Sequence, residues 1–500
     1  MLWFFNFILY VFVEISNEIF PPAKFDNPFR FEQVLSASFG EPRSSSFHTG
    51  IDIRTFGRIG DSVFAVEEGY VSRVFVSPYG YGKAIYINHP NGYTSVYAHL
   101  NNFSDDVASF IRDHQYRTER FDVDIALEKH LFPIKKGQLI GFAGNSGSSA
   151  GPHLHFEIRS TITEMPVDPL MFYFDIKDDI APEFSNIYFY PKTPESHVEQ
   201  DNRLKGKPLI KANGYYRLSD GDTISAYGLI GIGAHVTDRI TGSNNICGIN
   251  RLTMKVNQST VYDFIQDRLS FSHVRYVLSH TDFSLNRRFK KTVHKCFVEP
   301  GNKLPNYRQL VNRGLINVEP GKFYQIEIEA SDSRKNKSRV RFVIAGVGTS
   351  GTIPSKKNYR AVWIPNMANR YSDSTLSVSL PADAIYDTIF FDYEVKKPQH
   401  PFVSRLYSIG NPDIPLHKNI EIVFHNEKIP QKWQPYLVLV NATDKNLDVL
   451  DVSPKMVDDK IIAKIRTFTT VAFAVDTVPP RILPINLADG ASLNGQTSKK

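Results

Sequence analysis

Two short histidine motifs combine residue types and spacings that suit a metal site. A His-x-Gly-x-Asp motif places His48 and Asp52 four residues apart, and a His-x-His motif places His153 and His155 two residues apart. On an extended chain, side chains separated by an even number of residues face the same side. Isoleucines beside Asp52 and the alternating residues after His155 favour extended chain. Each pair is therefore expected to present its side chains in one direction.

Imidazoles combined with a carboxylate are common ligands of catalytic zinc, which keeps a fourth position for water. Calcium and magnesium prefer oxygen ligands, so zinc suits the mixed set better. Zinc lowers the pKa of a bound water towards about 7, and a neutral imidazole nearby can take up the proton. Either motif alone is common in proteins without a metal, so the prediction of a zinc hydrolase depends on their combination.

The elements that must position these motifs are short strands with tight turns, from about residue 28 to residue 174. Asn91–Gly92 is a strong hairpin signal, and the strand expected at Tyr93–Leu100 carries His99 near its end. A polar segment at about 105–128 is the one predicted helix. Two glycine-punctuated halves, which begin near residues 60 and 136, favour a compact antiparallel β-domain of the barrel-sandwich or duplicated-hybrid-motif type.

Three segments, HTGID, YAHL and GPHLHFEIR, follow one another in this order along the chain. In order and spacing they resemble the lysostaphin-type (LytM-like) zinc metallopeptidases, and so does the loop at 145–152. The resemblance covers about residues 39–174. The insertion at 101–133 is longer than the family pattern, which leaves the shape of the substrate groove open.

This resemblance implies a role for each residue of the site. It implies that His48, Asp52 and His155 hold one Zn²⁺ and that His99 and His153 assist catalysis. Which of the latter two is the general base stays open. The family also implies the substrate, the amide bonds of peptidoglycan cross-link peptides.

Other charged or ionisable residues of the region have less defined roles. Glu157 shares a strand face with His155, so it is either a competing base, as Glu119 is, or a partner that orients a ligand. Three further histidines carry no spacing signal and are expected at the surface: His89, His114 and His130.

The remaining chain is predicted to be mainly β, in β-sandwich (Ig-like) modules. A motif of the form Asp-x-aliphatic-x-Pro occurs at Asp178 and again at Asp476, and a stiff proline before a first strand suits a module boundary. The predicted division of the chain is a signal segment at 1–20, a zinc peptidase domain at 25–175, a β-sandwich-like module at 176–347, a second β-rich module at 348–475, and the start of a further module at 476–500.

The composition of the chain limits which cellular compartments and which partners we expect. The apolar run Leu2–Val13 has the length of an export signal and is too short to span a bilayer. We therefore expect an exported protein of the bacterial periplasm or cell envelope, without a transmembrane span. The net charge of +6 is spread along the chain, so nucleic-acid binding is not expected. Cys247 and Cys296 either pair or are buried free thiols.

Two other functions are consistent with parts of this pattern. A degenerate LytM-like domain, without activity of its own, can activate another wall hydrolase. The intact zinc ligands argue against that reading. Under either function, peptidase or regulator, three roles stay open for the later modules: to position the peptidase, to bind glycan or to contact envelope proteins. The second alternative function is a carrier protein with a phosphorylated histidine. Asp52 and the export signal argue against that function.

Overall fold

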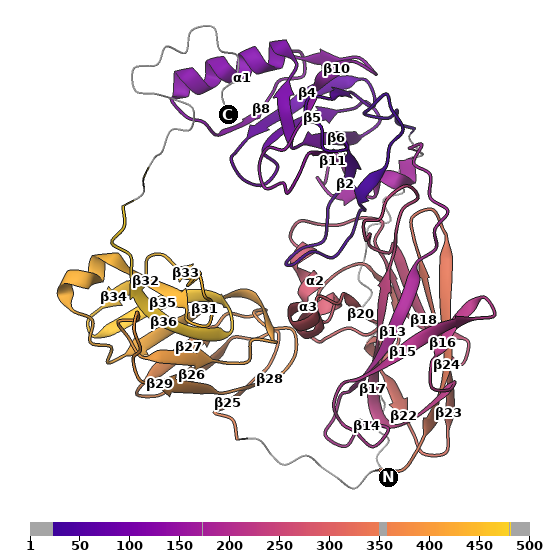
Figure 1. The fold of residues 1–500 in the computed structure, drawn as a ribbon, viewed down its shortest axis with the longest axis vertical. Coiled ribbons are helices and arrows are strands. Elements are labelled where there is room, and N and C mark those ends of the chain that lie inside the picture. Colours follow the sequence, from indigo (N-terminus) through magenta and orange to yellow (C-terminus); the bar gives the residue numbers. More distant parts are fainter. Residues whose placement is uncertain (1–23, 173, 350–357, 480, 482–500) are drawn as a thin grey trace, which may run out of the picture. The chain divides into compact units, whose positions relative to one another are not determined.

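The computed structural model of the chain describes residues 24–172, 174–349, 358–479 and 481 (Figure 1). The chain forms two compact units, residues 1–357 and 358–500. The prediction of a mainly β protein is confirmed. The predicted signal segment lies outside the described residues, as does most of 476–500. Within the described part, no helix has the length and apolar character that crossing a membrane requires.

The N-terminal region, residues 24–175, contains two antiparallel sheets. Its elements are β1 (Leu35–Ala37), β2 (Ile51–Arg54), β3 (Ser62–Phe64), β4 (Gly69–Val76), β5 (Lys83–Asn88), β6 (Tyr93–Ala98), β7 (Leu100–Phe103), α1 (Asp105–Thr118), β8 (Val123–Ala126), β9 (Pro133–Ile134), β10 (Leu139–Ala143), β11 (His153–Ser160), β12 (Pro166–Val167) and the short helix η1 (Pro169–Phe172). The large sheet has the order β1-β2-β11-β6-β5-β4-β8, and the small one β3-β10-β7. The pairing of β3 with β10 joins the two glycine-punctuated halves.

The helix of this region is shorter than predicted. α1 ends at Thr118, because Glu119 takes the left-handed conformation (φ 53°) and its N–H bonds back to the carbonyl of Gln115. The chain beyond it pairs with β4 as strand β8, and the prediction of helix up to residue 128 is therefore wrong.

The middle region, residues 176–347, is built on a large sheet that one long strand ties together. Its elements are β13 (Glu183–Pro191), β14 (His197–Val198), β15 (Lys205–Ala212), β16 (Tyr215–Leu218), β17 (Thr223–Thr237), β18 (Arg251–Val256), β19 (Ser259–Ile265), η2 (Val274–Tyr276), α2 (Val277–His280), α3 (Phe283–Phe289), β20 (Val293–Lys295), β21 (Tyr307–Leu310), η3 (Asn312–Gly314), β22 (Ile316–Val318), β23 (Phe323–Ser331) and β24 (Lys337–Gly346). β17 pairs with β24 near its start and with β13 over its second half. The short helices were not predicted.

A buried histidine pair lies in the core of the middle region. The Nε2 atom of His280 lies 3.0 Å from the Nδ1 atom of His294, and both rings are almost fully buried. Burial, with a smaller effect from His235, lowers the pKa of His294 to about 3. His294 is therefore neutral at neutral pH. Cys247 and Cys296 are both buried and free, so they do not pair.

The C-terminal region, residues 358–479, contains two five-stranded sheets and one two-stranded sheet, whose buried side chains form one apolar core. Its elements are β25 (Ala361–Trp363), β26 (Asn369–Ser372), β27 (Leu376–Leu380), β28 (Ile389–Phe391), β29 (Tyr393–Lys396), β30 (Leu406–Ile409), β31 (Pro415–His425), η4 (Gln431–Tyr436), β32 (Leu437–Asn441), β33 (Val449–Asp451), β34 (Lys455–Val457), β35 (Lys460–Thr467) and β36 (Thr469–Val475). The finer division of the chain at 175 and 347 stays a prediction.

Candidate metal centre

The central strand of the candidate site is β11, which carries His153 and His155 two residues apart. β2 pairs with β11 on one side, in a register that sets Asp52 directly opposite His155. β6 pairs with β11 on the other side and ends one residue before His99. Because residues opposite each other in antiparallel strands are close neighbours, the register gathers these four side chains.

His48 does not share a strand with Asp52, and this part of the alternation prediction is wrong. β2 begins only at Ile51, and His48 ends a tight hairpin of residues 40–48 that two backbone hydrogen bonds of 2.9 and 3.0 Å close. The chain bends into β2 at Gly50, where a Cβ atom would lie 2.4 Å from the carbonyl oxygen of Phe156 on β11. Glycine therefore allows the close approach that brings His48 to the site.

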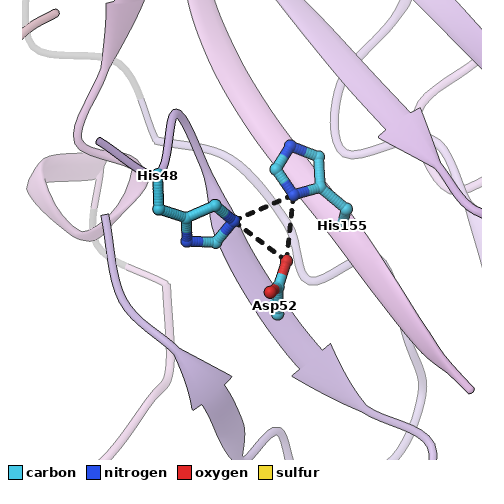
Figure 2. A group of neighbouring side chains, drawn as sticks. All are labelled: His48, Asp52 and His155. Atoms are coloured by element: carbon cyan, nitrogen blue, oxygen red, sulfur yellow. Dashed lines mark hydrogen bonds and ion pairs between the residues drawn. The ribbon is translucent and has the colours of Figure 1, made fainter. Parts of the chain in front are cut away.

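Three buried side chains converge in Figure 2: His48 from the hairpin, Asp52 from β2 and His155 from β11. The Nε2 atom of His48 lies 3.0 Å from Nδ1 of His155 and 3.1 Å from Oδ1 of Asp52, and the last two atoms lie 2.9 Å apart. A tetrahedral ion with bonds of about 2.0–2.1 Å separates its ligand atoms by roughly 3.3 Å. The three distances between ligand atoms in this triangle of side chains, 2.9–3.1 Å, are close to that separation.

The hydrogen bonds around the triangle fix which ring nitrogens lack a proton. Nδ1 of His48 bonds the carbonyl oxygen of Ser38 at 2.8 Å, and Nε2 of His155 bonds a carboxylate oxygen of Glu157 at 2.8 Å. Both partners only accept, so these two nitrogens donate, and the neutral rings turn lone pairs towards Asp52. With both rings neutral, three acceptors face one another, so the site needs a positive charge between them, either a proton on Nδ1 of His155 or a cation. A divalent cation with nitrogen and oxygen ligands fits the site.

The pKa values of His155 and Asp52 agree with the need for a positive charge at this site. Burial by itself lowers the pKa of His155, but hydrogen bonds to Asp52 and Glu157 outweigh it and raise that pKa to about 9. Burial by itself raises the pKa of Asp52, but the imidazoles around it hold that pKa well below its usual range. Arg43 also bonds Oδ2 of Asp52 at 2.8 Å, so Oδ1 is left for the cation.

Glu157 is fully buried and orients His155 from behind. Its oxygens accept hydrogen bonds from His155 Nε2 (2.8 Å), Thr49 Oγ1 (2.6 Å), the Tyr81 hydroxyl (2.7 Å) and Arg159 Nε (2.6 Å). Burial raises the pKa of Glu157, yet the charges of Arg159 and His155 hold it far below its usual range. This geometry matches the orienting role that the sequence left open. The sequence reasoning missed Arg159, although the alternation of β11 puts it on the same face.

The two remaining histidines lie beside the triangle and have similar hydrogen bonding. Nδ1 of His99 bonds the carbonyl oxygen of Ser146, and Nδ1 of His153 bonds that of Gly151, both at 2.8 Å. Their rings lie 4.8 Å apart, centre to centre. When either ring is neutral, these bonds keep its proton on Nδ1, so Nε2 carries the lone pair that a general base requires. Burial and the charges of His155 and His153 lower the pKa of His99 to about 4, so His99 is neutral at neutral pH.

An open cleft of about 560 Å³ lies over the site, lined by Asp52 and both of these imidazoles. The loop at 148–152 and Arg43 form other parts of its lining. Asn245 of the middle region also lines the cleft, and its Nδ2 donates to the carbonyl oxygen of Ser36 at 3.0 Å. Two regions of the chain therefore shape the space in front of the candidate metal centre.

The structure brings the five predicted site residues together, and it corrects one expectation about the others. His89, expected at the surface, is buried between the carbonyl of Glu68 and the hydroxyl of Ser95, each at 2.7 Å. An imidazole can be buried when both of its nitrogens have hydrogen-bond partners, and the position of His89 in the sequence does not reveal such partners. Glu119 is exposed at the end of α1 and does not line the cleft.

Comparison with known proteins agrees with the geometry. The family model for "Peptidase family M23" matches residues 46–116 and 127–169, and that for "Zu5-like domain" matches residues 361–476. DD-carboxypeptidase/endopeptidase Mpg of Neisseria meningitidis is 35% identical over 91 residues, which are 18% of this chain and 15% of that protein. Peptidoglycan DD-endopeptidase ShyB of Vibrio cholerae is 28% identical over 156 residues, 31% of this chain and 30% of that protein.

Among solved structures, the catalytic domain of the antimicrobial peptidase lysostaphin from Staphylococcus simulans is 26% identical. That match covers 28% of this chain and 91% of the lysostaphin domain, with a TM-score of 0.21. The chain thus covers less than a third of the length of the two curated relatives. The peptidase family model matches within the N-terminal region. The chain carries a domain of peptidase family M23, the lysostaphin-type metallopeptidases.

Proposed function

We propose that the N-terminal region is a zinc-dependent endopeptidase that hydrolyses amide bonds in peptidoglycan cross-link peptides. One observation carries the proposal: Nε2 of His48, Oδ1 of Asp52 and Nδ1 of His155 face one point, each within 3.1 Å of the other two, while hydrogen bonds to Ser38 and Glu157 hold the outer nitrogens of both rings. Such a set suits one Zn²⁺ per domain and leaves a fourth position for water. The name of the Vibrio relative, a peptidoglycan endopeptidase, supports the choice of substrate.

In this proposal the chain's own residues move the protons. A zinc ion held by His48, Asp52 and His155 would act as a Lewis acid, which polarises the scissile carbonyl and lowers the pKa of a water molecule. Nε2 of His99 or His153 accepts the proton of the attacking water and returns it to the leaving amine. The second imidazole, when it is protonated, stabilises the negative oxygen that develops on the carbonyl. Glu157 keeps His155 in the tautomer that offers Nδ1.

The cellular location follows from the substrate. Peptidoglycan lies outside the cytoplasm, so we propose that the chain acts in the periplasm or cell envelope of a bacterium. The middle and C-terminal regions are then available to contact envelope partners.

The test uses purified chain and purified peptidoglycan, with the released peptides identified by mass spectrometry. Wild type is expected to release cross-link peptides and to stop when a chelator is added. His155→Ala is expected to lose both zinc and activity, whereas His99→Ala is expected to keep zinc and lose activity. His114→Ala, on α1 away from the cleft, is the matched control and is expected to keep both. A zinc-loaded wild type that releases no peptide would favour the inactive, regulatory reading instead.

A further inference from the structure

Three carboxylates meet in the middle region, away from the proposed zinc site. Asp178 comes from the segment before β13, Asp238 follows the end of β17, and Asp332 lies in the turn between β23 and β24. One oxygen of each lies within 4.8 Å of one oxygen of both others. Segments far apart in the sequence therefore place three acidic groups around one point.

The carboxyl group of Asp238 is buried with one of its two oxygens unpaired. Asp238 is only 3% exposed, and its Oδ1 atom is buried without a hydrogen-bond partner. The nearest guanidinium in sequence, that of Arg239, pairs with Glu183 at 2.9 Å. A buried polar atom without a partner is costly, and a cation between the three groups would remove the cost.

We infer that Asp178, Asp238 and Asp332 form a calcium site. All the ligand atoms are oxygens, which favours a hard cation and distinguishes this cluster from the nitrogen-containing zinc site. Three carboxylates can supply up to about six oxygens if each binds in bidentate fashion, within the range that Ca²⁺ takes. Mg²⁺ requires stricter octahedral geometry and keeps several of its waters, so a cluster of carboxylates favours Ca²⁺.

The inference gives a role to a motif that the proposed peptidase does not use. Asp178 is the first residue of the Asp-x-aliphatic-x-Pro motif, and its Oδ1 accepts the N–H of Ile180 at 3.2 Å. In the second copy, Oδ1 of Asp476 accepts the N–H of Val478 at 3.1 Å. The local turn is thus repeated, and in the first copy it holds the aspartate next to two further carboxylates.

A cation there would tie together the segments that join the N-terminal and middle regions. From the turn of Asp332, the Arg334 guanidinium donates to the carbonyl oxygen of Phe174 at 2.6 Å. Asp238 opens the loop at 239–246, which brings Asn245 to the rim of the cleft. Calcium at the cluster would therefore hold both the junction and this part of the cleft wall in place.

The test is calcium titration of the full, zinc-loaded chain by calorimetry, together with thermal unfolding with and without Ca²⁺. We expect about one Ca²⁺ per chain, a Kd on the order of 10⁻⁴–10⁻³ M, and weaker binding of Mg²⁺. Asp238→Asn and Asp332→Asn are expected to weaken binding about tenfold or more, because each removes a charged ligand. Asp222→Asn, an exposed aspartate in the same region, is the matched control and is expected to bind as wild type does.

Thermal unfolding separates the calcium site from a mere cluster of repelling acids. With a cation site, Ca²⁺ raises the Tm of wild type and of Asp222→Asn, but not that of Asp238→Asn. Without Ca²⁺, Asp238→Asn is expected to be at least as stable as wild type, because an amide NH₂ group can donate a hydrogen bond to a neighbouring carboxylate. No binding heat and no Tm change for wild type at about 10 mM Ca²⁺, well above this Kd range, would overturn the inference. So would equal calcium affinity in wild type and both folded ligand variants.

Discussion

Replacing Glu157 by glutamine changes one carboxylate oxygen into an NH₂ group at a position where every neighbour donates. One oxygen of Glu157 accepts from three donors, among them Nε2 of His155, and the other accepts from Arg159. Glutamine has only one acceptor oxygen. Whichever way the amide turns, an NH₂ group faces either the donors around His155 or the Arg159 guanidinium.

The size of the effect follows from these contacts. The bond to His155 loses its negative partner, and loss of such a bond typically costs a metal site about 10–100-fold in affinity. This range corresponds to about 1.4–2.7 kcal/mol, similar to the roughly 1.5–3 kcal/mol of a charged hydrogen bond. The Arg159 side chain is 5% exposed, and a buried charge that loses its partner costs about 3–5 kcal/mol of folding free energy.

Zinc affinity is measured by competition with a chromogenic chelator, at a temperature where circular dichroism shows the variant to be folded. Glu164→Gln is the matched control, because Glu164 contacts the same Arg159 at 3.5 Å, is exposed, and does not touch His155. We expect Glu164→Gln to bind zinc as wild type does. A folded Glu157→Gln protein with unchanged zinc affinity would refute the orienting role of Glu157.

Three further predictions concern other parts of the chain. Gly50→Ala should push β2 away from β11, lower the free energy of unfolding by about 1–3 kcal/mol and reduce the zinc content. Gly151→Ala is the control, because a Cβ atom there meets open space, and it should change neither stability nor zinc content. Equal zinc content of the two variants would contradict the close approach at Gly50. The pKa of His294 falls from 6.5 unfolded to about 3 folded, so its stabilisation is complete above about pH 6.5 and is lost as the pH falls. Between pH 7 and 5 this loss is about 2 kcal/mol, and chemical unfolding of His294→Gln should show a pH dependence flatter by that amount. Cys247 and Cys296 should resist a thiol reagent in the native protein and both react in denaturant, and fewer than two reactive thiols would contradict their free state.

The site was more predictable than the fold, for physical reasons. Strand alternation needs only the local sequence, so it put His153, His155 and Glu157 on one face of β11. The register that sets Asp52 opposite His155 depends on pairing between distant segments. The sequence did not predict this register, and the choice of Asp52 and His155 as ligands of one metal came from the family resemblance. The hairpin that carries His48 is set by backbone hydrogen bonds and by the approach at Gly50, which spacing does not reveal.

Other features depend on contacts that the sequence does not record. The helix ends at Thr118 because the next residue turns left-handed and the chain joins β4, a competition that composition alone does not decide. The burial of His89 and the contact of Asn245 with the cleft come from packing between segments. The acidic cluster of the middle region combines residues 178, 238 and 332, and no local pattern connects them.

The most direct test of the central claim is the metal content of the purified wild-type chain, compared with its hydrolysis of peptidoglycan before and after chelation. A three-ligand site predicts about one zinc per chain, peptide release that stops when the metal is removed, and recovery when zinc is restored. A chain without zinc at stoichiometric loading, or peptide release that survives complete removal of the metal, would contradict the account.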